Sequence, residues 1–412
     1  MFELLSPAGS MESLKAGIQN GADAIYLGGS SFGARASATN FDNDELIEAV
    51  KHAKLRNVNI FVTVNTSIKE TEVEELISYT DFLYKIGVDA IILSDIGIAE
   101  VLRKRYPNME LHASTQISAH SLNDVLELKK VGFDRVVIAR ELGTEEIKEI
   151  CDNVDIDIEV FIHGAICVSY SGQCLMSSML GDRSGNRGRC AQPCRQSYKL
   201  INKTTGKIIN VNGNYLLSPK DLCSIENIEK ILDTGVKSLK IEGRMKSIYY
   251  NSTVVKQYRK AIDSYYSGNY EYDPEWYKEL QTISHRLYSK GFYLGKTTEE
   301  DQNYNTGNSY SQTYQLVANV KEKLEDGKYL LQIRNRVFAD DTLELIRPEG
   351  DPIKFKVKNF FNTKTEEYVE VVHPNTIAVI ESELEMGPMD LIRIKLPEGK
   401  SESDMDTETN TL

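Results

Sequence analysis

Five of the six cysteines lie between Cys167 and Cys223, and four of these have the spacing of a metal or cluster site. They are Cys167, Cys174, Cys190 and Cys194, in the pattern C-x6-C-x15-C-x3-C. Thiolates are soft ligands that suit zinc or iron–sulfur clusters. We therefore expect the reactive centre of the protein in this segment. Cys151 stands apart in a helical stretch and is expected to be a small buried apolar residue.

Three interpretations of these cysteines are open: disulfides, a zinc site or an iron–sulfur cluster. The chain starts MFELLSPAG, without the charged and apolar regions of a secretory signal, so we expect a cytoplasmic protein with reduced thiols. Zinc sites usually contain short C-x2-4-C pairs, and here only Cys190 and Cys194 approach that spacing. The spacing favours an iron–sulfur cluster.

Short apolar, β-branched runs alternate with amphipathic helical stretches over the first 250 residues. Such alternation indicates βαβ units and a parallel sheet, and eight units predict a (β/α)8 barrel, with an open doubly wound sheet as the alternative. The expected strands are Glu3–Ser6, Ala24–Gly28, Asn59–Val64, Ala90–Ser94, Glu110–Ser114, Arg135–Ala139, Ile158–Ile162 and Ser238–Ile241.

One connection is much longer than the others. About 75 residues separate the seventh and eighth expected strands, far more than a usual βα loop. The five clustered cysteines lie in this insertion, residues 165–237. Barrel enzymes build their sites from loops at the carboxyl ends of the strands, and the insertion begins at such an end. We therefore expect the cysteines over the barrel mouth.

Polar residues follow several of the expected strands and should face the same cavity. Arg140 and Arg244 stand at strand ends, where two guanidinium groups can bind a small carboxylate. Lys240 and Glu242 are two residues apart and should point the same way from their strand. The other strand-end residues considered are Gln116 and His163, and for His163 a general acid or base, a ligand-orienting group and an ordinary buried histidine all stay open.

The charge of the chain is unevenly distributed. Its net charge is −13, the wrong global sign for a nucleic-acid binder, and residues 398–412 form an acidic tail expected to be disordered. Against this, the segment from Arg183 to Lys207 contains Arg187, Arg189 and further basic residues and no acid. Such a stripe can serve a polyanionic substrate, or it can be an ordinary solvated loop.

The chain is expected to hold two domains. Residues 1–295 should form the barrel, 296–312 a linker, and 313–397, where short strands alternate with turn signals, a small antiparallel β-barrel. No apolar run reaches the length of a membrane span. The hydrolase motifs HExxH and GxSxG are absent.

At this point the motifs identify a family. The stretch EVFIHGAIC, continuing through SGQC, resembles the signature of peptidase family U32, the collagenase-like family. GRCAQPCR, LLSPKDLC and SLKIEGRMKS look like it as well. The resemblance runs from Phe2 to about Gly295, and the small β domain is similar to the family's C-terminal domain.

The resemblance is greatest to the prephenate-dependent tRNA uridine hydroxylases of this family. It implies a 4Fe–4S cluster on Cys167, Cys174, Cys190 and Cys194, prephenate as co-substrate, and tRNA as the partner whose wobble uridine becomes 5-hydroxyuridine. Some relatives take a ligand from a later cysteine, where this chain has Cys223, so the fourth ligand stays open between Cys194 and Cys223.

Within this reading, catalysis is expected of His163, Glu242 and Lys240. Substrate binding is expected of Arg140, Arg244, Gln116, Arg187 and Arg189. The alternatives are a U32-type peptidase, for which Cys167 and His163 supply a nucleophile and a base, and a non-catalytic iron–sulfur assembly protein. A related partner subunit is left open, and no membrane association is expected.

Overall fold

The computed structural model describes residues 2–35, 39–209, 214–304, 310–325 and 327–397. The predicted acidic tail lies outside them. The chain divides into two compact units, one of Met1–Tyr277 with Arg286–Ser309 and the other of Lys278–His285 with Tyr310–Leu412. Residues 278–285, which the sequence places in the barrel domain, thus group with the second unit. There, Arg393 binds Glu279 and Thr282, which fixes the segment to the β domain.

Eight parallel strands form the centre of the first unit. They are β1 (Glu3–Pro7), β2 (Ala24–Leu27), β3 (Asn59–Val64), β4 (Ala90–Leu93), β5 (Glu110–Ala113), β6 (Arg135–Val137), β7 (Asp157–Gly164) and β11 (Ser238–Ile241). Each strand pairs with the next in parallel, and β11 pairs with both β1 and β7, which closes the sheet. In this register Lys240 lies beside Leu5 on one side and Phe161 on the other. The predicted (β/α)8 barrel is confirmed.

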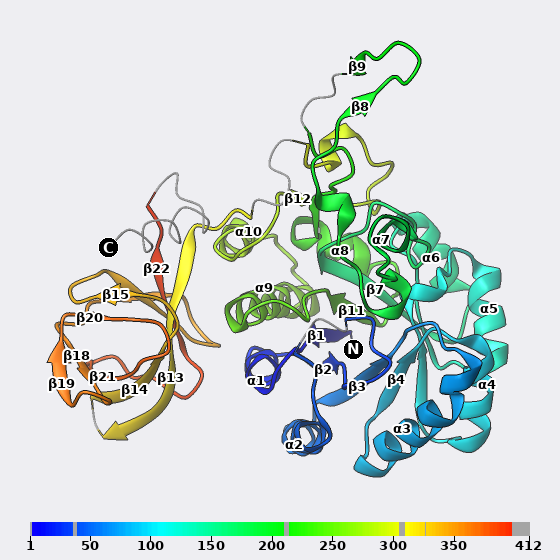
Figure 1. Cartoon of the computed structure of the whole chain (residues 1–412). Coiled ribbons are helices and arrows are strands. Elements are labelled where there is room, and N and C mark those ends of the chain that lie inside the picture. The colour runs from blue at the N-terminus through cyan, green and yellow to red at the C-terminus, as the bar shows by residue number, and fades with distance from the viewer. Residues whose placement is uncertain (1, 36–38, 210–213, 305–309, 326, 398–412) are drawn as a thin grey trace. The chain divides into compact units, whose positions relative to one another are not determined.

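A helix follows each barrel strand, directly or after the insertion, and the helices lie outside the strands (Figure 1). They are α1 (Met11–Gln19), α2 (Asn43–Lys54), α3 (Val73–Ile86), α4 (Ile96–Arg105), α5 (Leu122–Val131), α6 (Thr144–Asp152), α8 (Ile228–Leu232) and α9 (Ile248–Tyr266). Several begin at a side-chain cap, as where Asp42 accepts a hydrogen bond from the Glu45 amide. Gly87 ends α3 in the left-handed conformation that glycine adopts without strain.

The chain between β7 and β11 carries its own short elements. These are α7 (Met176–Gly181), the 3-10 turns η3 (Gly185–Arg187), η4 (Pro193–Arg195) and η5 (Ile225–Asn227), and the strands β8 (Leu200–Ile201), β9 (Ile208–Ile209) and β10 (Asp221–Cys223). Strand β10 pairs antiparallel with the end of β7, and β12 (Tyr288–Ser289) pairs with β10. The insertion is thereby fixed to the carboxyl end of β7. Beyond the barrel, α10 covers Pro274–Leu280, and the remaining 3-10 turns are η1 (Glu70–Glu72), η2 (Thr115–Ile117) and η6 (Glu299–Asp301).

The second unit contains an eight-stranded antiparallel sheet in the order β17-β16-β22-β13-β14-β21-β18-β19. These strands are β13 (Tyr314–Glu325), β14 (Lys328–Ile333), β16 (Leu343–Ile346), β17 (Ile353–Phe355), β18 (Phe360–Asn362), β19 (Glu367–Val369), β21 (Ile377–Glu381) and β22 (Leu391–Lys395). A separate pair joins β15 (Val337–Phe338) and β20 (Val371–Val372). The buried core of the second unit includes Val317, Ile333 and Phe360. The predicted antiparallel domain is confirmed as a sheet, and among its described strands no pairing joins the edges β17 and β19 into a barrel.

Among the described residues, no helix combines the length and the apolar character that crossing a membrane requires.

Candidate active site

The four cysteines with cluster spacing gather in the loop that follows β7. Cys167 and Cys190 are exposed, whereas Cys174 and Cys194 are half-buried. Burial raises the pKa of the Cys194 thiol, and the charges of Cys167, Cys190 and Cys174 raise it further. The other three thiols therefore lie near enough to Cys194 to affect its ionisation. In the described part of the chain, no three His, Cys, Asp or Glu side chains converge closely enough to hold a single metal ion.

The loop that carries these cysteines is fixed from within by Arg195. This side chain is buried and donates hydrogen bonds to Ser218 Oγ at 3.0 Å and to the Ile166 carbonyl at 2.9 Å. It thus joins the residue just before Cys167 to a later part of the insertion, at Ser218. Arg195 belongs to the basic stretch that the sequence offers for binding a polyanion. In the structure its guanidinium is instead hydrogen-bonded within the cysteine loop and stabilises the fold of that loop.

Cys223 lies apart from the other four in strand β10, opposite His163 of β7. It is 3% exposed, and the Tyr258 hydroxyl lies 4.0 Å from its sulfur. Burial raises the pKa of the Cys223 thiol to about 12, so it stays protonated at neutral pH. Burial likewise raises the pKa of Cys151 to about 11. Burial thus keeps Cys223 in the neutral thiol form, whereas the surroundings of Cys194 include the other three thiols of the loop.

His163 lies at the end of β7, enclosed by aromatic rings. It is 1% exposed, its Nδ1 lies 3.3 Å from the Tyr258 hydroxyl, and its ring packs against Tyr250, Tyr258 and Tyr288. This is the environment of a positioned, buried histidine rather than of a solvent-accessible base.

Lys240 is held inside the barrel by an ion pair. Its Nζ donates to Glu159 Oε1 at 2.7 Å and lies 4.5 Å from the centre of the Tyr26 ring. Glu159 is fully buried and also binds Arg135 at 3.3 Å. Burial alone would raise the pKa of Glu159, but Lys240 and Arg135 outweigh it and lower the pKa to about 2. Lys240 therefore takes part in the charged core of the barrel.

Glu242, two residues after Lys240, does not take part in that charged core and forms an ion pair with Arg35. Arg35 Nη2 lies 3.2 Å from Glu242 Oε1. Burial lowers the pKa of Arg35, but Glu242 and then Cys167 outweigh it and raise the pKa overall. The Arg35–Glu242 pair thus lies within electrostatic reach of the cysteine loop. Sequence reasoning missed Arg35, which belongs to the loop after β2 and lies more than 200 residues before its partner.

Arg244 is a buried cation held by neutral groups. It is 5% exposed, and its guanidinium donates to Thr63 Oγ1 at 2.9 Å and to Asn40 Oδ1 at 2.6 Å. Its Nε is buried and has no hydrogen-bond partner within the described structure. Burial lowers the pKa of Arg244 to about 10, which still leaves it charged at neutral pH.

The glycine that follows β2 makes room for this guanidinium. A Cβ added at Gly28 would lie 1.9 Å from Arg244 Nη2. Because Gly28 has no side chain, the Arg244 guanidinium can pack directly against the backbone at this position.

Arg140, the other strand-end arginine, is half-buried near the start of the insertion. Its Nη1 donates to the Ala165 carbonyl at 3.0 Å, and its guanidinium lies 5.3 Å from the centre of the Phe161 ring. Arg140 and Arg244 have different hydrogen-bond partners, so the two arginines have separate surroundings.

A cavity of about 460 Å³ opens between the loops of the barrel mouth and the insertion, a size that suits a small ligand. Its walls come from the loop after β2, the loop after β3 and the insertion. Residues that line it are Ser30, Ser31, Asn40, Thr66, Lys69, Glu72, Glu75, Asp182, Ser184, Arg187 and Arg189. Asn40, which binds Arg244, therefore connects this cavity to the buried guanidinium.

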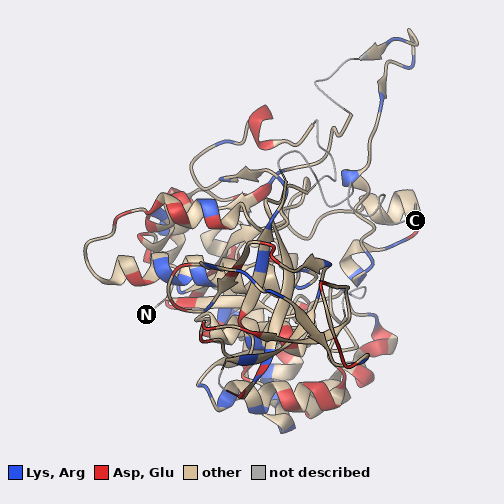
Figure 2. Ribbon diagram, turned by 90° about the vertical axis from the view of Figure 1, so that its left-hand side faces the viewer, with Lys and Arg blue, Asp and Glu red and all other residues tan. Residues whose placement is uncertain are grey.

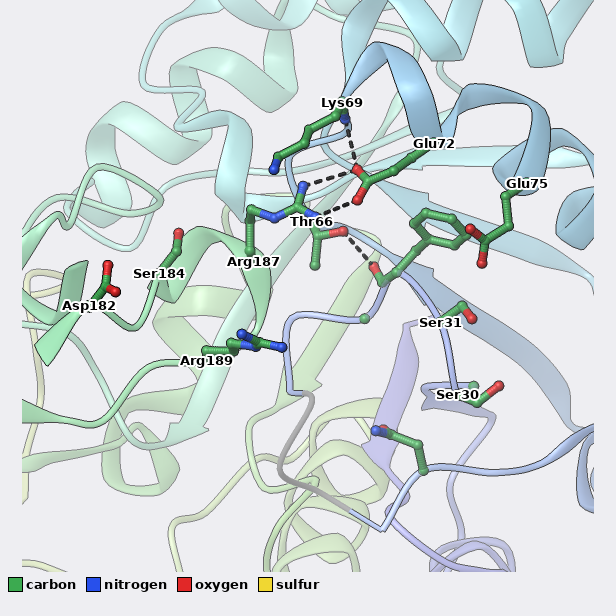
Figure 3. A pocket seen from close by; sticks show the side chains of 14 residues that line it. Ser30, Ser31, Thr66, Lys69, Glu72, Glu75, Asp182, Ser184, Arg187 and Arg189 are labelled. Carbon is green, nitrogen blue, oxygen red and sulfur yellow. Dashed lines mark hydrogen bonds and ion pairs between the residues drawn. The ribbon is translucent and has the colours of Figure 1, made fainter.

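The two predicted arginines in this cavity differ in their partners (Figure 3). Arg187 binds both oxygens of Glu72, one at 3.0 Å and the other at 2.5 Å, and donates to the Ser67 carbonyl at 2.7 Å. Hydrogen bonding by Arg187 lowers the pKa of Glu72 to about 2. Arg189 also lines the cavity, from the insertion side. Arg187 therefore joins the insertion to the loop after β3.

Gln116 lines a smaller cavity of about 150 Å³, together with Asn65, Asp95 and Gly172. Gly172 has a φ of +74°, and a Cβ there would lie 2.2 Å from the Gln116 carbonyl oxygen. This glycine lets the segment between Cys167 and Cys174 pack directly on the strand-end residue.

Known sequences match this chain along nearly its whole length. The sequence model of peptidase family U32 matches residues 9–303, and that of the U32 C-terminal domain matches residues 312–393. A Bacillus subtilis protein named tRNA hydroxylation protein P1 is 37% identical over 95% of this chain and 94% of its own. The Escherichia coli 23S rRNA 5-hydroxycytidine C2501 synthase is 42% identical over 64% of this chain and 39% of its own. A Porphyromonas gingivalis protein named collagenase is 34% identical over 76% and 78%, respectively.

Proposed function

The chain belongs to peptidase family U32, and we propose that it is an RNA-hydroxylating enzyme acting on tRNA. The relatives support this class of reaction, because a protein named for tRNA hydroxylation aligns with almost the whole chain and one named for rRNA cytidine hydroxylation aligns with 64% of it. The finer proposal is that the wobble uridine becomes 5-hydroxyuridine, with prephenate as co-substrate.

The observation that carries the proposal is the gathering of four thiols in the loop at the carboxyl end of β7. Soft sulfur donors fit an iron–sulfur cluster, and we assign Cys167, Cys174, Cys190 and Cys194 as the residues that would hold a 4Fe–4S cluster. Such a cluster would supply one-electron chemistry at the barrel mouth. The high pKa of Cys223 supports leaving that residue out of the ligand set.

The buried guanidinium of Arg244 is the strongest candidate for the co-substrate's carboxylate. Its hydrogen-bond partners are neutral, and a carboxylate would supply a counter-charge in direct contact with it. Prephenate has two carboxylates. Arg140 is the candidate for the second, and the cavity at Asn40 supplies the space through which a ligand could reach Arg244.

The three predicted catalytic residues take different roles in this proposal. Glu242, paired with Arg35 within electrostatic reach of Cys167, is our candidate for the catalytic carboxylate beside the reacting centre. Lys240 and His163 are packed among internal partners, and we assign them to positioning.

A peptidase is the second candidate, because one relative is named collagenase. Its chemistry would need a base to activate Cys167. His163 is the residue closest in sequence, but its enclosure by three tyrosines and its contact with Tyr258 do not favour that role.

The test is deletion of the gene, followed by mass spectrometry of nucleosides from purified tRNA. Loss of 5-hydroxyuridine, restored by the wild-type gene but not by Cys167→Ala, is the expected result. Cys151→Ala is the matched control, since this thiol lies outside the insertion, and it should restore the modification. An unchanged tRNA in the deletion strain, together with gelatin hydrolysis by the purified protein, would favour the peptidase.

A further inference from the structure

The insertion contains a β-hairpin whose residues 199–208 are exposed to solvent. Strands β8 and β9 pair through Leu200 with Ile209 and Ile201 with Ile208. Every residue from 199 to 208 is exposed, including the apolar Leu200 (47%), Ile201 (56%) and Ile208 (52%). In Figure 1 the hairpin extends away from the barrel.

The hairpin is nevertheless well formed by its own hydrogen bonds. The Asn202 amide donates to the Lys207 carbonyl at 2.9 Å, and the Gly206 amide donates to the Asn202 carbonyl at 2.8 Å. The Asn202 side chain accepts hydrogen bonds from the amides of Thr204 and Thr205, which fixes the turn. A two-stranded hairpin without further packing is only marginally stable in water, so an exposed one is suited to be ordered by a partner.

The charged side chains of the hairpin are all positive. Lys199, Lys203 and Lys207 lie on it, and no Asp or Glu occurs between Arg183 and Lys220, although the whole chain carries −13. Figure 2 shows the hairpin with basic residues in blue and none in red. Arg187 and Arg195, earlier in the same stretch, are engaged with Glu72 and with the cysteine loop. The lysines of the hairpin, which belong to the basic stripe seen in the sequence, are therefore more available than these two arginines.

We propose that residues 199–209 form an RNA-binding arm, in which the three lysines contact phosphates of the tRNA substrate away from the reacting base. This proposal rests on the proposed function. Lysine and phosphate attract each other without regard to sequence, so the arm would position the RNA and not select the base. The exposed Leu200, Ile201 and Ile208 would lie against the sugars between the phosphates.

The charge pattern favours RNA over a protein partner. Lysine is depleted at protein interfaces, whose buried centres exclude charge. Here, three lysines occur within nine residues, alongside three exposed aliphatic side chains. A polyanion such as an RNA backbone is the occupant that this composition recognises.

The test compares two triple variants of the full-length protein. The arm variant carries Lys199→Gln, Lys203→Gln and Lys207→Gln. The control carries Lys51→Gln, Lys85→Gln and Lys237→Gln, three exposed lysines elsewhere on the barrel unit, and has the same net charge. Binding of tRNA purified from the deletion strain is measured by filter retention between ~0.05 and ~0.3 M salt, and tRNA modification is measured in the complemented strain.

If the arm binds RNA, the arm variant alone loses about two to three units of salt slope, and its binding weakens by between one and two orders of magnitude at ~0.15 M salt. Equal affinity and slope in the wild type, the control and the arm variant would overturn the proposal. Unchanged RNA binding by the arm variant with loss of modification would also overturn it, and would point to a protein partner. If the wild-type protein itself neither binds nor modifies tRNA, the proposed function fails first.

Discussion

The buried guanidinium of Arg244 predicts an unusual combination of effects on stability and binding. In Arg244→Met the buried charge is removed. In the wild-type protein, burial lowers the pKa of the Arg244 guanidinium from its ordinary value to about 10, and that difference corresponds to a penalty of about 3 kcal/mol against the folded state at neutral pH. Because the folded pKa is the lower one, the penalty is fully present below about pH 10 and disappears only as the pH rises toward the pKa of the guanidinium in the unfolded chain.

The opposing cost of Arg244→Met is the loss of two hydrogen bonds. Thr63 and Asn40 would each lose a donor, at about 1–3 kcal/mol for a buried acceptor and less for the half-buried Asn40. The two contributions nearly cancel, so we expect the free energy of unfolding to change by less than about 1 kcal/mol. Prephenate should nevertheless bind about 30- to 150-fold more weakly, since a charge-assisted contact contributes about 2–3 kcal/mol.

Arg135→Met is the matched control, because Arg135 is equally buried but bound to Glu3 and Glu159. Its removal leaves buried carboxylates unpaired and should cost about 3–5 kcal/mol. The assays are urea unfolding followed by circular dichroism and anaerobic calorimetric titration with prephenate. If Arg244→Met is destabilised as strongly as Arg135→Met while its prephenate affinity is unchanged, Arg244 is a structural residue and our reasoning is wrong.

Three other predictions concern the proposed cluster, the barrel core and the second unit. Cys194→Ala should lower iron and sulfide content together and Cys223→Ala should not, as measured on anaerobically purified protein; the reverse result would make Cys223 the fourth ligand. Glu159 contributes about 3 kcal/mol that is present above about pH 4.5 and lost as the pH falls toward 2, because its folded pKa of about 2 lies below the ordinary 4.5. Glu159→Gln should therefore be less stable at pH 7 and show a flatter acid dependence in unfolding experiments, whereas an unchanged acid limb would contradict this role. Arg393→Met removes a buried partner of Glu279 and Glu344 and should destabilise the second unit by about 3–5 kcal/mol in thermal or urea unfolding; a loss below about 1 kcal/mol would show that solvent compensates these carboxylates.

Local sequence patterns determined the architecture of this protein. The alternation of apolar strands and amphipathic helices predicted the barrel, because burial of one helix face and both strand faces imposes those periods on the sequence. The interval between β7 and β11 marked the insertion, and the spacing of its cysteines indicated a candidate metal or cluster site within it. The residues at strand ends could be named in advance, because parallel strands bring their carboxyl ends to one edge.

Only the tertiary structure decided what each of those residues contacts. Arg195 and Arg187 belong to the same basic stretch as Lys203, yet one is buried in the cysteine loop, one is paired with Glu72 and one is exposed on the hairpin. In the sequence alone these three side chains are equivalent, because each carries one positive charge. Their partners come from segments far away along the chain, and the free energy of each cation depends on those partners and on its distance from water.

The same reason separates Cys194 from Cys223 and explains why Arg35 was missed. A thiol's pKa depends on burial and on neighbouring charges, and β10 carries Cys223 into the interior beside Tyr258 while η4 leaves Cys194 among three other thiols. Arg35 meets Glu242 across two loops of the barrel mouth. Such pairings depend on closure of the barrel and on the path of its loops, which no local period in the sequence encodes.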